Sequence, residues 1–408
     1  MTNTRKNLLD LERRKTMKKI LILSCSFVIA ICTLTACNHK RTPSKPDKPT
    51  IVATKTDSQN ILDILSSDNN NVVLSDFSIK MALSMLMEGA SNETLNELES
   101  YYDKPISSLS KQNKKLINSY NQLQHTNLNI ANSLWYDQLS CHVKDDYIST
   151  LKSNYMAEVT PIHFNSSGSS HIINNWCKQK TNNLISKIVD DNALKNMKTI
   201  LINTLYFKGT WLEPFYENNT KQDIFKNSDG TTSQVNFMHS KESTYLETEN
   251  ATGFMKPYSD GIVFVGILPK DEKVNVEDIN IKKIIETKTN IYDVYIKVPK
   301  MKLEYGTSLK EAFKKVGIKK VFSDKADLKK ISDDDLFISD ILHKTHIEVN
   351  ESGTEAAAAT IIEEKTSSSF QAPKEKKEVN LDKPFVFAIY DSVNDEILFS
   401  GKITNLQS

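Results

Sequence analysis

The chain has 408 residues, of which 39% are hydrophobic and 25% charged, a composition typical of a soluble globular protein with a sizeable core. Its 52 basic and 51 acidic residues leave a net charge of +1, which gives no support for a nucleic-acid-binding protein. Glycine occurs only 11 times, and no G-x-x-x-x-G-K, H-E-x-x-H or C-x-x-C motif is present. The sequence therefore predicts no cofactor and no metal site.

The N-terminal segment has the pattern of an export signal. Lys18 and Lys19 precede an apolar run over residues 20–35, which is too short to span a bilayer comfortably. The run ends in Leu-Thr-Ala-Cys at Cys37, which resembles the bacterial lipoprotein box. The resemblance implies cleavage before Cys37, fatty acylation of its thiol with chains such as palmitate, and a place on the outer membrane or cell surface. An ordinary signal peptide or a transmembrane anchor is the alternative.

Composition divides the chain into three parts. Residues 1–36 read as an N-terminal extension and signal peptide, and translation starts at Met1 or at Met17. Residues 37–57 are rich in Lys and Pro and read as a lipidated Cys with a flexible tether. Residues 58–408 read as one globular domain. In that domain Cys141 and Cys177 remain, and we expect free, partly buried thiols, although an exported protein permits a disulfide.

The predicted elements of the domain come in an order that favours an α+β protein. A short strand at 71–75 precedes a helix that Ser75 or Ser78 caps, and a second helix opens at Ser91. The continuous apolar run at 199–207, with Asn203 in its middle, suits a strand buried on both faces. Helices come mostly early and strands mostly late. The remaining predictions are strands at 128–136, 263–268, 291–299 and 336–349, a helix at 172–189 with a transition at its end, and a hairpin of 385–390 with 396–402.

One stretch near the C-terminus allows two interpretations. Four alanines, Ala356, Ala357, Ala358 and Ala359, follow a Gly-Thr-Glu turn and precede Thr360. Alanine has the best helix propensity, so the run alone indicates the start of a short helix. The alternative is an exposed loop whose small side chains let it slide into a sheet.

Several other stretches decide between these interpretations. They are residues 71–78 with Glu88-Gly89-Ala90, Ile173-Asn174-Asn175-Trp176 with Thr181-Asn182, residues 199–211 and 321–328, His343-Lys344-Thr345, and residues 385–401. Together with the alanine run, and in this order, they resemble the serpin family of serine protease inhibitors. The resemblance implies the serpin fold, with three β-sheets, eight or nine helices and an exposed reactive-centre loop at about residues 351–383.

In a serpin the alanine run would be the hinge of the reactive loop. Side chains alternate along a strand, so one face would carry Thr354, Ala356, Ala358 and Thr360, all small enough for a packed interior. Gly353 gives the backbone freedom to turn as insertion starts. The hinge residues that the resemblance assigns are Glu351, Gly353, Thr354, Ala356, Ala357, Ala358, Ala359 and Thr360.

The resemblance also assigns residues that support the sheet. Ser75, Ser78, Asn203 and His343 match the family's shutter, a polar cluster beneath the opening strands, and His343 is expected to bond Asn203 in one state. Trp211 matches the tryptophan of the breach, where the loop first enters. The family usually has Pro where this chain has Asp76, and Asp76 is expected to cap the next helix instead.

The implied function is suicide inhibition of a protease, without catalysis by this chain. The loop is longer than usual, so several bonds are candidates for cleavage. Lys365 suits a trypsin-like pocket and Thr366 or Ser367 an elastase-like one, with Ser368 after them, while Phe370 suits a chymotrypsin-like or papain-like protease. The expected partners are serine proteases held in a covalent complex and a membrane, with no nucleic acid, and the expected state is a monomer. A non-inhibitory serpin that acts as a binding module is the alternative.

Overall fold

A computed structural model describes residues 57–66, 70–271, 278–354 and 373–407 of the chain. All of them belong to one compact unit, which spans Ala53–Ser408. Within these ranges the structure has nine α-helices and three β-sheets. The predicted α+β class, with three sheets and eight or nine helices, is therefore confirmed.

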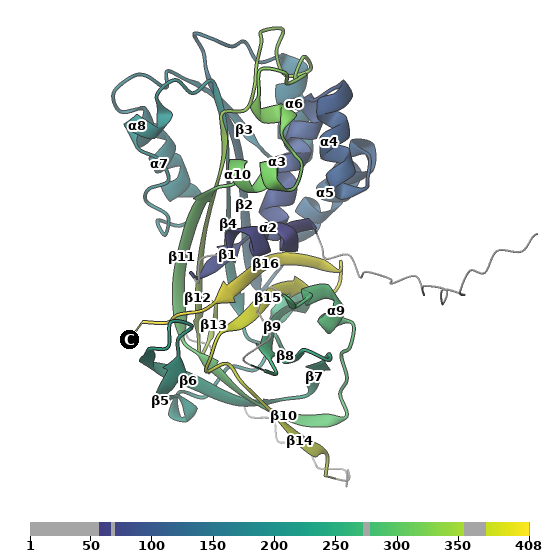
Figure 1. Ribbon diagram of the computed structural model, residues 1–408, viewed down its shortest axis with the longest axis vertical. Coiled ribbons are helices and arrows are strands. Elements are labelled where there is room, and N and C mark those ends of the chain that lie inside the picture. The colour runs from purple at the N-terminus through teal and green to yellow at the C-terminus, as the bar shows by residue number, and fades with distance from the viewer. Residues whose placement is uncertain (1–56, 67–69, 272–277, 355–372, 408) are drawn as a thin grey trace, which may run out of the picture. The chain divides into compact units, whose positions relative to one another are not determined.

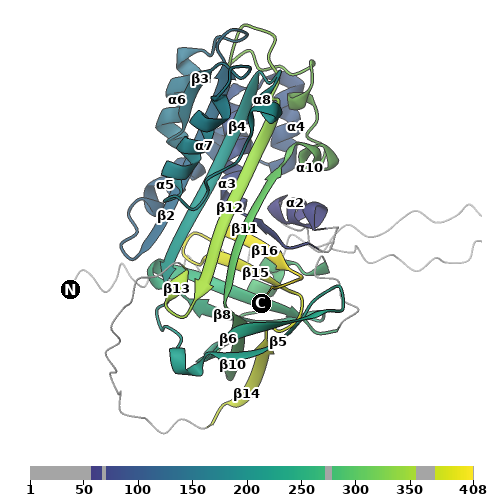
Figure 2. The same cartoon turned by 90° about the vertical axis from the view of Figure 1, so that its left-hand side faces the viewer.

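The central sheet, one of two six-stranded sheets, contains the long strands that Figure 2 shows side by side. Strands β4 and β12 pair in parallel over seven residue pairs, from Ile200 opposite Asp340 to Tyr206 opposite His346. Beyond that point the two-residue strand β13 lies between them. The order across the sheet is β11 (Met301–Ser308), β12 (Asp340–Asn350), β13 (Gly353–Thr354), β4 (Thr199–Thr210), β2 (Thr126–Asp137) and β3 (Glu158–Ile162).

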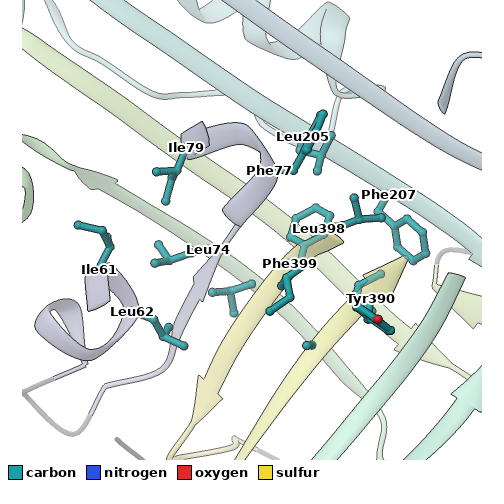
Figure 3. Packing of buried hydrophobic residues seen from close by; sticks show 14 of the residues in the cluster. Ile61, Leu62, Leu74, Phe77, Ile79, Leu205, Phe207, Tyr390, Leu398 and Phe399 are labelled. Atoms are coloured by element: carbon teal, nitrogen blue, oxygen red, sulfur yellow. The ribbon is translucent and has the colours of Figure 1, made fainter. Parts of the chain in front are cut away.

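Strand β4 is buried on both faces, as its continuous apolar run predicts. Leu205 and Phe207 point into the main core, where they pack near Phe399 (Figure 3). Ile200 and Ile202 point the other way, into a second cluster that includes Trp176 of α7 (Ser169–Lys180). Figure 1 shows α7 on the opposite side of the long strands from α3, α4 and α5. The central sheet is thus enclosed between two apolar layers.

Two further sheets complete the domain below the long strands in Figure 1. The first has the order β1 (Val72–Leu74), β16 (Glu396–Ile403), β15 (Phe385–Asp391), β9 (Ile262–Pro269), β8 (Ala251–Pro257) and β7 (Thr244–Glu247), and contains the predicted terminal hairpin. The second has the order β14 (Glu375–Asn380), β10 (Tyr292–Pro299), β6 (Thr232–Glu242) and β5 (Lys221–Lys226).

Helix α3 (Asp76–Gly89) is the most deeply buried helix of the described ranges, and its start corrects one expectation. Ser75 is the N-cap, and its hydroxyl accepts a hydrogen bond from the amide of Ser78. Asp76 is the first helical residue rather than the cap. The other helices are α2 (Asp57–Leu65), α4 (Asn92–Tyr102), α5 (Ile106–Tyr120), α6 (Asp145–Tyr155), α8 (Asp191–Leu194), α9 (Ile281–Ile285) and α10 (Lys310–Lys315).

The two cysteines of the described domain are free thiols, and both are buried. Burial raises the pKa of the Cys177 thiol to about 12 and also raises that of Cys141. Both are therefore inert thiols of the core at neutral pH. Among the described residues, no helix is both long and apolar enough to cross a membrane.

Candidate functional site

The start of the predicted hinge is built into the central sheet. After β12 the chain turns at Glu351 and Ser352, and β13 then runs back between β12 and β4. Thr354 lies opposite Val349 on one side and Gly209 on the other, and its side chain is fully buried. Figure 2 shows β13 at the ends of β4 and β12. The first inward-facing hinge residue thus occupies the gap where these two strands diverge.

Gly353 is needed at this position because two backbones meet there. Its φ of +152° is one that side-chain-bearing residues rarely adopt, and a Cβ at this position would lie 2.0 Å from the carbonyl oxygen of Gly209. Because the Gly209 oxygen belongs to the backbone, it cannot rotate away from such a Cβ. Glycine therefore allows β13 to lie against β4.

An aromatic cluster holds the hinge from below. The hydroxyl groups of Tyr258 and Thr354 share a hydrogen bond of 2.7 Å. The Tyr258 ring stacks on Trp211, with centroids 3.9 Å apart and planes inclined by 9°. The indole N–H of Trp211 donates to the carbonyl of Asn350, the last residue of β12. Trp211, which the resemblance assigns to the breach, therefore lies where β12 ends and the turn toward β13 begins.

An ion pair between Glu351 and Lys300 holds the turn that precedes β13. The carboxylate of Glu351 lies 2.8 Å from the ammonium of Lys300 and accepts a 2.8 Å hydrogen bond from the hydroxyl of Thr220. Burial acts to raise the pKa of this carboxyl, but the bonds from Lys300 and Thr220 outweigh it and hold the pKa below its usual value. The Glu351 side chain is therefore charged and fixed at neutral pH.

The four shutter residues lie together, but their bonds differ from the expectation. His343 lies opposite Asn203 across β12 and β4, yet its Nε2 accepts a hydrogen bond from the backbone amide of Ser75. The amide of Asn203 donates instead to the side-chain carbonyl of Asn132 on β2. The expected bond between His343 and Asn203 is absent from the hydrogen bonds of the described residues. Three polar residues therefore lie side by side across the sheet: Asn132 on β2, Asn203 on β4 and His343 on β12.

Asn132 was not among the residues predicted for the site, although its position in the sequence is unusual. It stands among inward-facing apolar residues of a predicted strand, as Asn203 does in the next strand. A buried amide of this kind needs a partner, and the register of β2 against β4 supplies it. Tyr258 was missed too, and no local pattern singles it out.

The described shutter keeps several polar atoms without a protein partner. They are Ser78 Oγ, Asn203 Oδ1 and His343 Nδ1, all buried. Burial also lowers the pKa of His343 to about 3, so its ring is neutral at physiological pH. A neutral imidazole with one free N–H beside a free amide oxygen can change partners without moving a charge.

The remaining predicted site residues lie outside the described residues. The structure places Glu351, Gly353 and Thr354 of the hinge. At the other end of the predicted loop of about 351–383, residues 375–380 are not an exposed loop but strand β14, paired with β10. The undescribed residues are Cys37, Ala356, Ala357, Ala358, Ala359, Thr360, Lys365, Thr366, Ser367, Ser368 and Phe370. In the part of the chain that is described, no group of three or more His, Cys, Asp or Glu side chains is placed to hold a metal ion.

Known proteins resemble this chain both in sequence and in fold. The family model of the serpins, described as serine protease inhibitors, matches residues 57–406. Iripin-8 of Ixodes ricinus is 34% identical over 364 residues, which cover 84% of this chain and 89% of that protein. Leukocyte elastase inhibitor A of Mus musculus is 31% identical over 362 residues, which cover 83% of this chain and 94% of that protein.

Among solved structures, the native state of Tengpin, a thermophilic serpin, matches with a TM-score of 0.78 and 32% identity. The match covers 86% of this chain and 92% of Tengpin. The family model spans most of the chain, and the fold matches that of a solved serpin. The chain belongs to the serpin family, whose members are typically protease inhibitors rather than enzymes.

Proposed function

We propose that this protein is an irreversible suicide-substrate inhibitor of serine proteases. The observation that supports this most strongly is the position of Thr354, which is fully buried between β4 and β12. If the chain continued as a strand, Ala356, Ala358 and Thr360 would follow on the same face, and none of them is larger than Thr354. A loop of this composition can continue into the sheet where its first residue already lies.

The proposed reaction uses the chemistry of the target protease. The protease's serine oxygen bonds to the carbonyl carbon of the scissile residue, the peptide C–N bond breaks, and the new amino terminus takes a proton from the protease's histidine. An ester then joins the protease to the loop. Insertion of the loop between β4 and β12 carries the protease away and distorts its active site, so that water does not complete the hydrolysis.

The target class follows from the side chains near the expected scissile bond. We infer trypsin-like or elastase-like proteases, with cleavage after Lys365, Thr366 or Ser367, and a chymotrypsin-like or cysteine protease if Phe370 is used. Mass spectrometry of the C-terminal fragment that each protease releases identifies the bond. A fragment that begins outside residues 366–371 would contradict this assignment.

The inhibitory function is tested by mixing the protein with trypsin or pancreatic elastase and looking for an SDS-resistant adduct. We expect an adduct with at least one of them. Thr354→Arg should abolish the adduct and leave cleavage intact, because the gap that holds Thr354 has no room for a guanidinium. Thr232→Arg, at the exposed start of β6, is the control and should leave the adduct unchanged. Cleavage by both proteases without any adduct would favour a non-inhibitory binding module.

We also propose that the protein is a bacterial lipoprotein anchored through Cys37, on the outer membrane or cell surface. The lipobox-like sequence before Cys37 supports this proposal. Expression with radiolabelled palmitate should label the protein, and Cys37→Ser should remove the label and release the protein from the membrane fraction. An equally labelled Cys37→Ser protein would contradict it.

A further inference from the structure

A buried cation, the ammonium of Lys256, lies against the aromatic residues beside the hinge. Lys256 of β8 is only 2% exposed, and its ammonium lies 2.7 Å from the carboxylate of Glu242 on β6. Ser240 donates a 2.6 Å hydrogen bond to the same carboxylate. Lysine is almost never fully buried unless it is paired, because removal of its charge from water is costly. A pair in such a position requires an explanation.

The ammonium of Lys256 faces aromatic rings as well as Glu242. It lies 4.3 Å from the ring centroid of Phe215 and 5.5 Å from that of Trp211. A desolvated cation at these distances is attracted to the ring face. The two rings meet each other edge to face, with centroids 5.7 Å apart. Lys256 thus contacts both rings that extend from the end of β4.

These rings are connected to the hinge by direct bonds. The indole of Trp211 holds the carbonyl of Asn350, and its backbone amide donates to Ser352. The backbone amide of Phe215 donates to the carbonyl of Glu351 at 2.9 Å. Each residue from Asn350 to Ser352 is therefore bonded to a segment whose side chains rest on the Lys256 cation.

We propose that Lys256 and Glu242 are positioning residues for the reactive-loop hinge. The cation fixes the rings of Trp211 and Phe215, and Glu242 compensates the charge of the cation. The fixed rings hold Tyr258 and the turn, and these hold Thr354 in the gap between β4 and β12. The consequence for inhibition rests on the function proposed above, whereas the consequence for hinge order does not.

A purely structural role for this pair gives a different expectation. If the pair only ties β6 to β8, its loss lowers the stability of the whole domain and has no selective effect on the hinge. Lys80 and Glu396 provide the matched control, because they form a 3.0 Å ion pair between α3 and β16 at 12% and 15% exposure, remote from the hinge.

The experiment compares amide hydrogen exchange of the peptide that spans residues 350–354 in the full chain without protease. Lys256→Met keeps the length of the side chain but removes the cation, and hinge exchange should rise about tenfold. Lys256→Arg keeps a cation and should restore exchange to within about twofold of the parent. Lys80→Met should leave hinge exchange unchanged.

Two further variants separate the cation's contact with the rings from simple charge balance. Lys256→Met with Glu242→Gln removes the uncompensated carboxylate, and the hinge should stay as loose as in Lys256→Met. Phe215→Leu keeps the ion pair but removes the nearer ring, and it should loosen the hinge about as much. It also serves as the test if Lys256→Met does not fold.

The outcomes decide the proposal without reference to inhibition. A hinge that exchanges at the parent rate in Lys256→Met and Phe215→Leu, or that the double variant fully restores, would overturn it. With trypsin or elastase, a loosened hinge should shift the products of Lys256→Met from adduct toward cleaved inhibitor. If the parent itself forms no adduct, the proposed function fails, and the exchange result still stands for the positioning role.

Discussion

At the scale of single residues, Gly353 illustrates how one missing side chain permits the hinge geometry. Its hypothetical Cβ meets the backbone oxygen of Gly209 at 2.0 Å, so any larger residue must displace one of two strands. Thr354 then cannot keep its bond to Tyr258. The identity of residue 353 therefore determines whether the hinge starts inside or outside the sheet.

Gly353→Ala should expel β13 from the sheet, at a cost of about 1–3 kcal/mol in the native state. We expect faster amide exchange at Thr354 and a smaller fraction of adduct with a target protease. Gly306→Ala on β11 is the control, because its new methyl group meets only the flexible side chain of Lys344, at 3.3 Å. An unchanged Thr354 exchange rate in Gly353→Ala would contradict the proposed packing.

The buried His343 should make the free energy of unfolding depend on pH. Burial lowers its folded pKa from 6.5 to about 3, so the unfolded chain binds a proton below pH 6.5 that the folded protein does not bind. Its contribution is complete above pH 6.5 and is lost progressively as the pH falls toward 3. The free energy of unfolding should decrease by about 2 kcal/mol between pH 7.5 and pH 5 from this group alone.

Urea denaturation of the intact protein at several pH values measures this loss. His343→Gln cannot bind a proton, so the corresponding part of the pH dependence should disappear in that variant. A variant whose stability falls with pH as steeply as that of the parent would show that other groups are responsible.

At the scale of elements, the decisive contact is the parallel pairing of β4 with β12. The proposed loop insertion would break this pairing from Tyr206 opposite His346 down to Ile200 opposite Asp340, while every other strand pairing in the sheet could be kept. Separation of the strands also removes His343 from the neighbourhood of Asn203. Because the cores on both faces contact β4, the opening requires movement of whole elements.

A disulfide between β4 and β12 should lock the sheet. Leu205 and Thr345 are register partners that point into the main core, away from the buried Cys177 in the outer cluster. The double variant Leu205→Cys with Thr345→Cys should be cleaved by the target protease and form no adduct when oxidised. Reduction should restore the adduct to the parent level. Adduct formation by the oxidised form would show that insertion does not pass between these strands.

At the scale of the whole molecule, the proposed inhibition requires that the intact chain is not in its most stable arrangement. Beyond Tyr206 and His346 the strands β4 and β12 are separated, and of the described hinge residues Gly353 and Thr354 lie between them. Several buried polar atoms of the described shutter residues also lack protein partners. A full inserted strand would add backbone hydrogen bonds on both sides. An inserted strand pairs with both β4 and β12 in place of their one mutual ladder, so the proposed mechanism predicts a release of free energy after cleavage.

The nicked protein should therefore melt later than the intact protein. Differential scanning calorimetry of the two forms at equal concentration measures this, and we expect an increase of more than about 10 °C, since the gain from a complete strand is several kcal/mol. The Thr354→Arg variant is the control, because nicking should not stabilise it. If the parent shows equal melting temperatures before and after nicking, no stored energy exists and the suicide mechanism fails.

The sequence alone determined the local features. The apolar run at 199–207, the Ser75 cap and the terminal hairpin follow from residue type and period, which depend on near neighbours. The serpin resemblance supplied the fold, because those motifs keep their order along the chain, and it assigned the residues of the hinge, shutter and breach as predictions. The small inward face from Thr354 onward is likewise a property of the sequence itself.

Only the tertiary structure decided which side chains meet. Asn203 bonds Asn132 rather than His343 because the register between β2 and β4 brings together residues 71 positions apart. Thr354 meets Tyr258 from a separation of 96 positions. Glu242 and Lys256 are both charged and would be expected at the surface, yet packing of β6 and β8 beneath Trp211 buries them as a pair. Such partnerships depend on the geometry of many elements at once, and no local pattern records them.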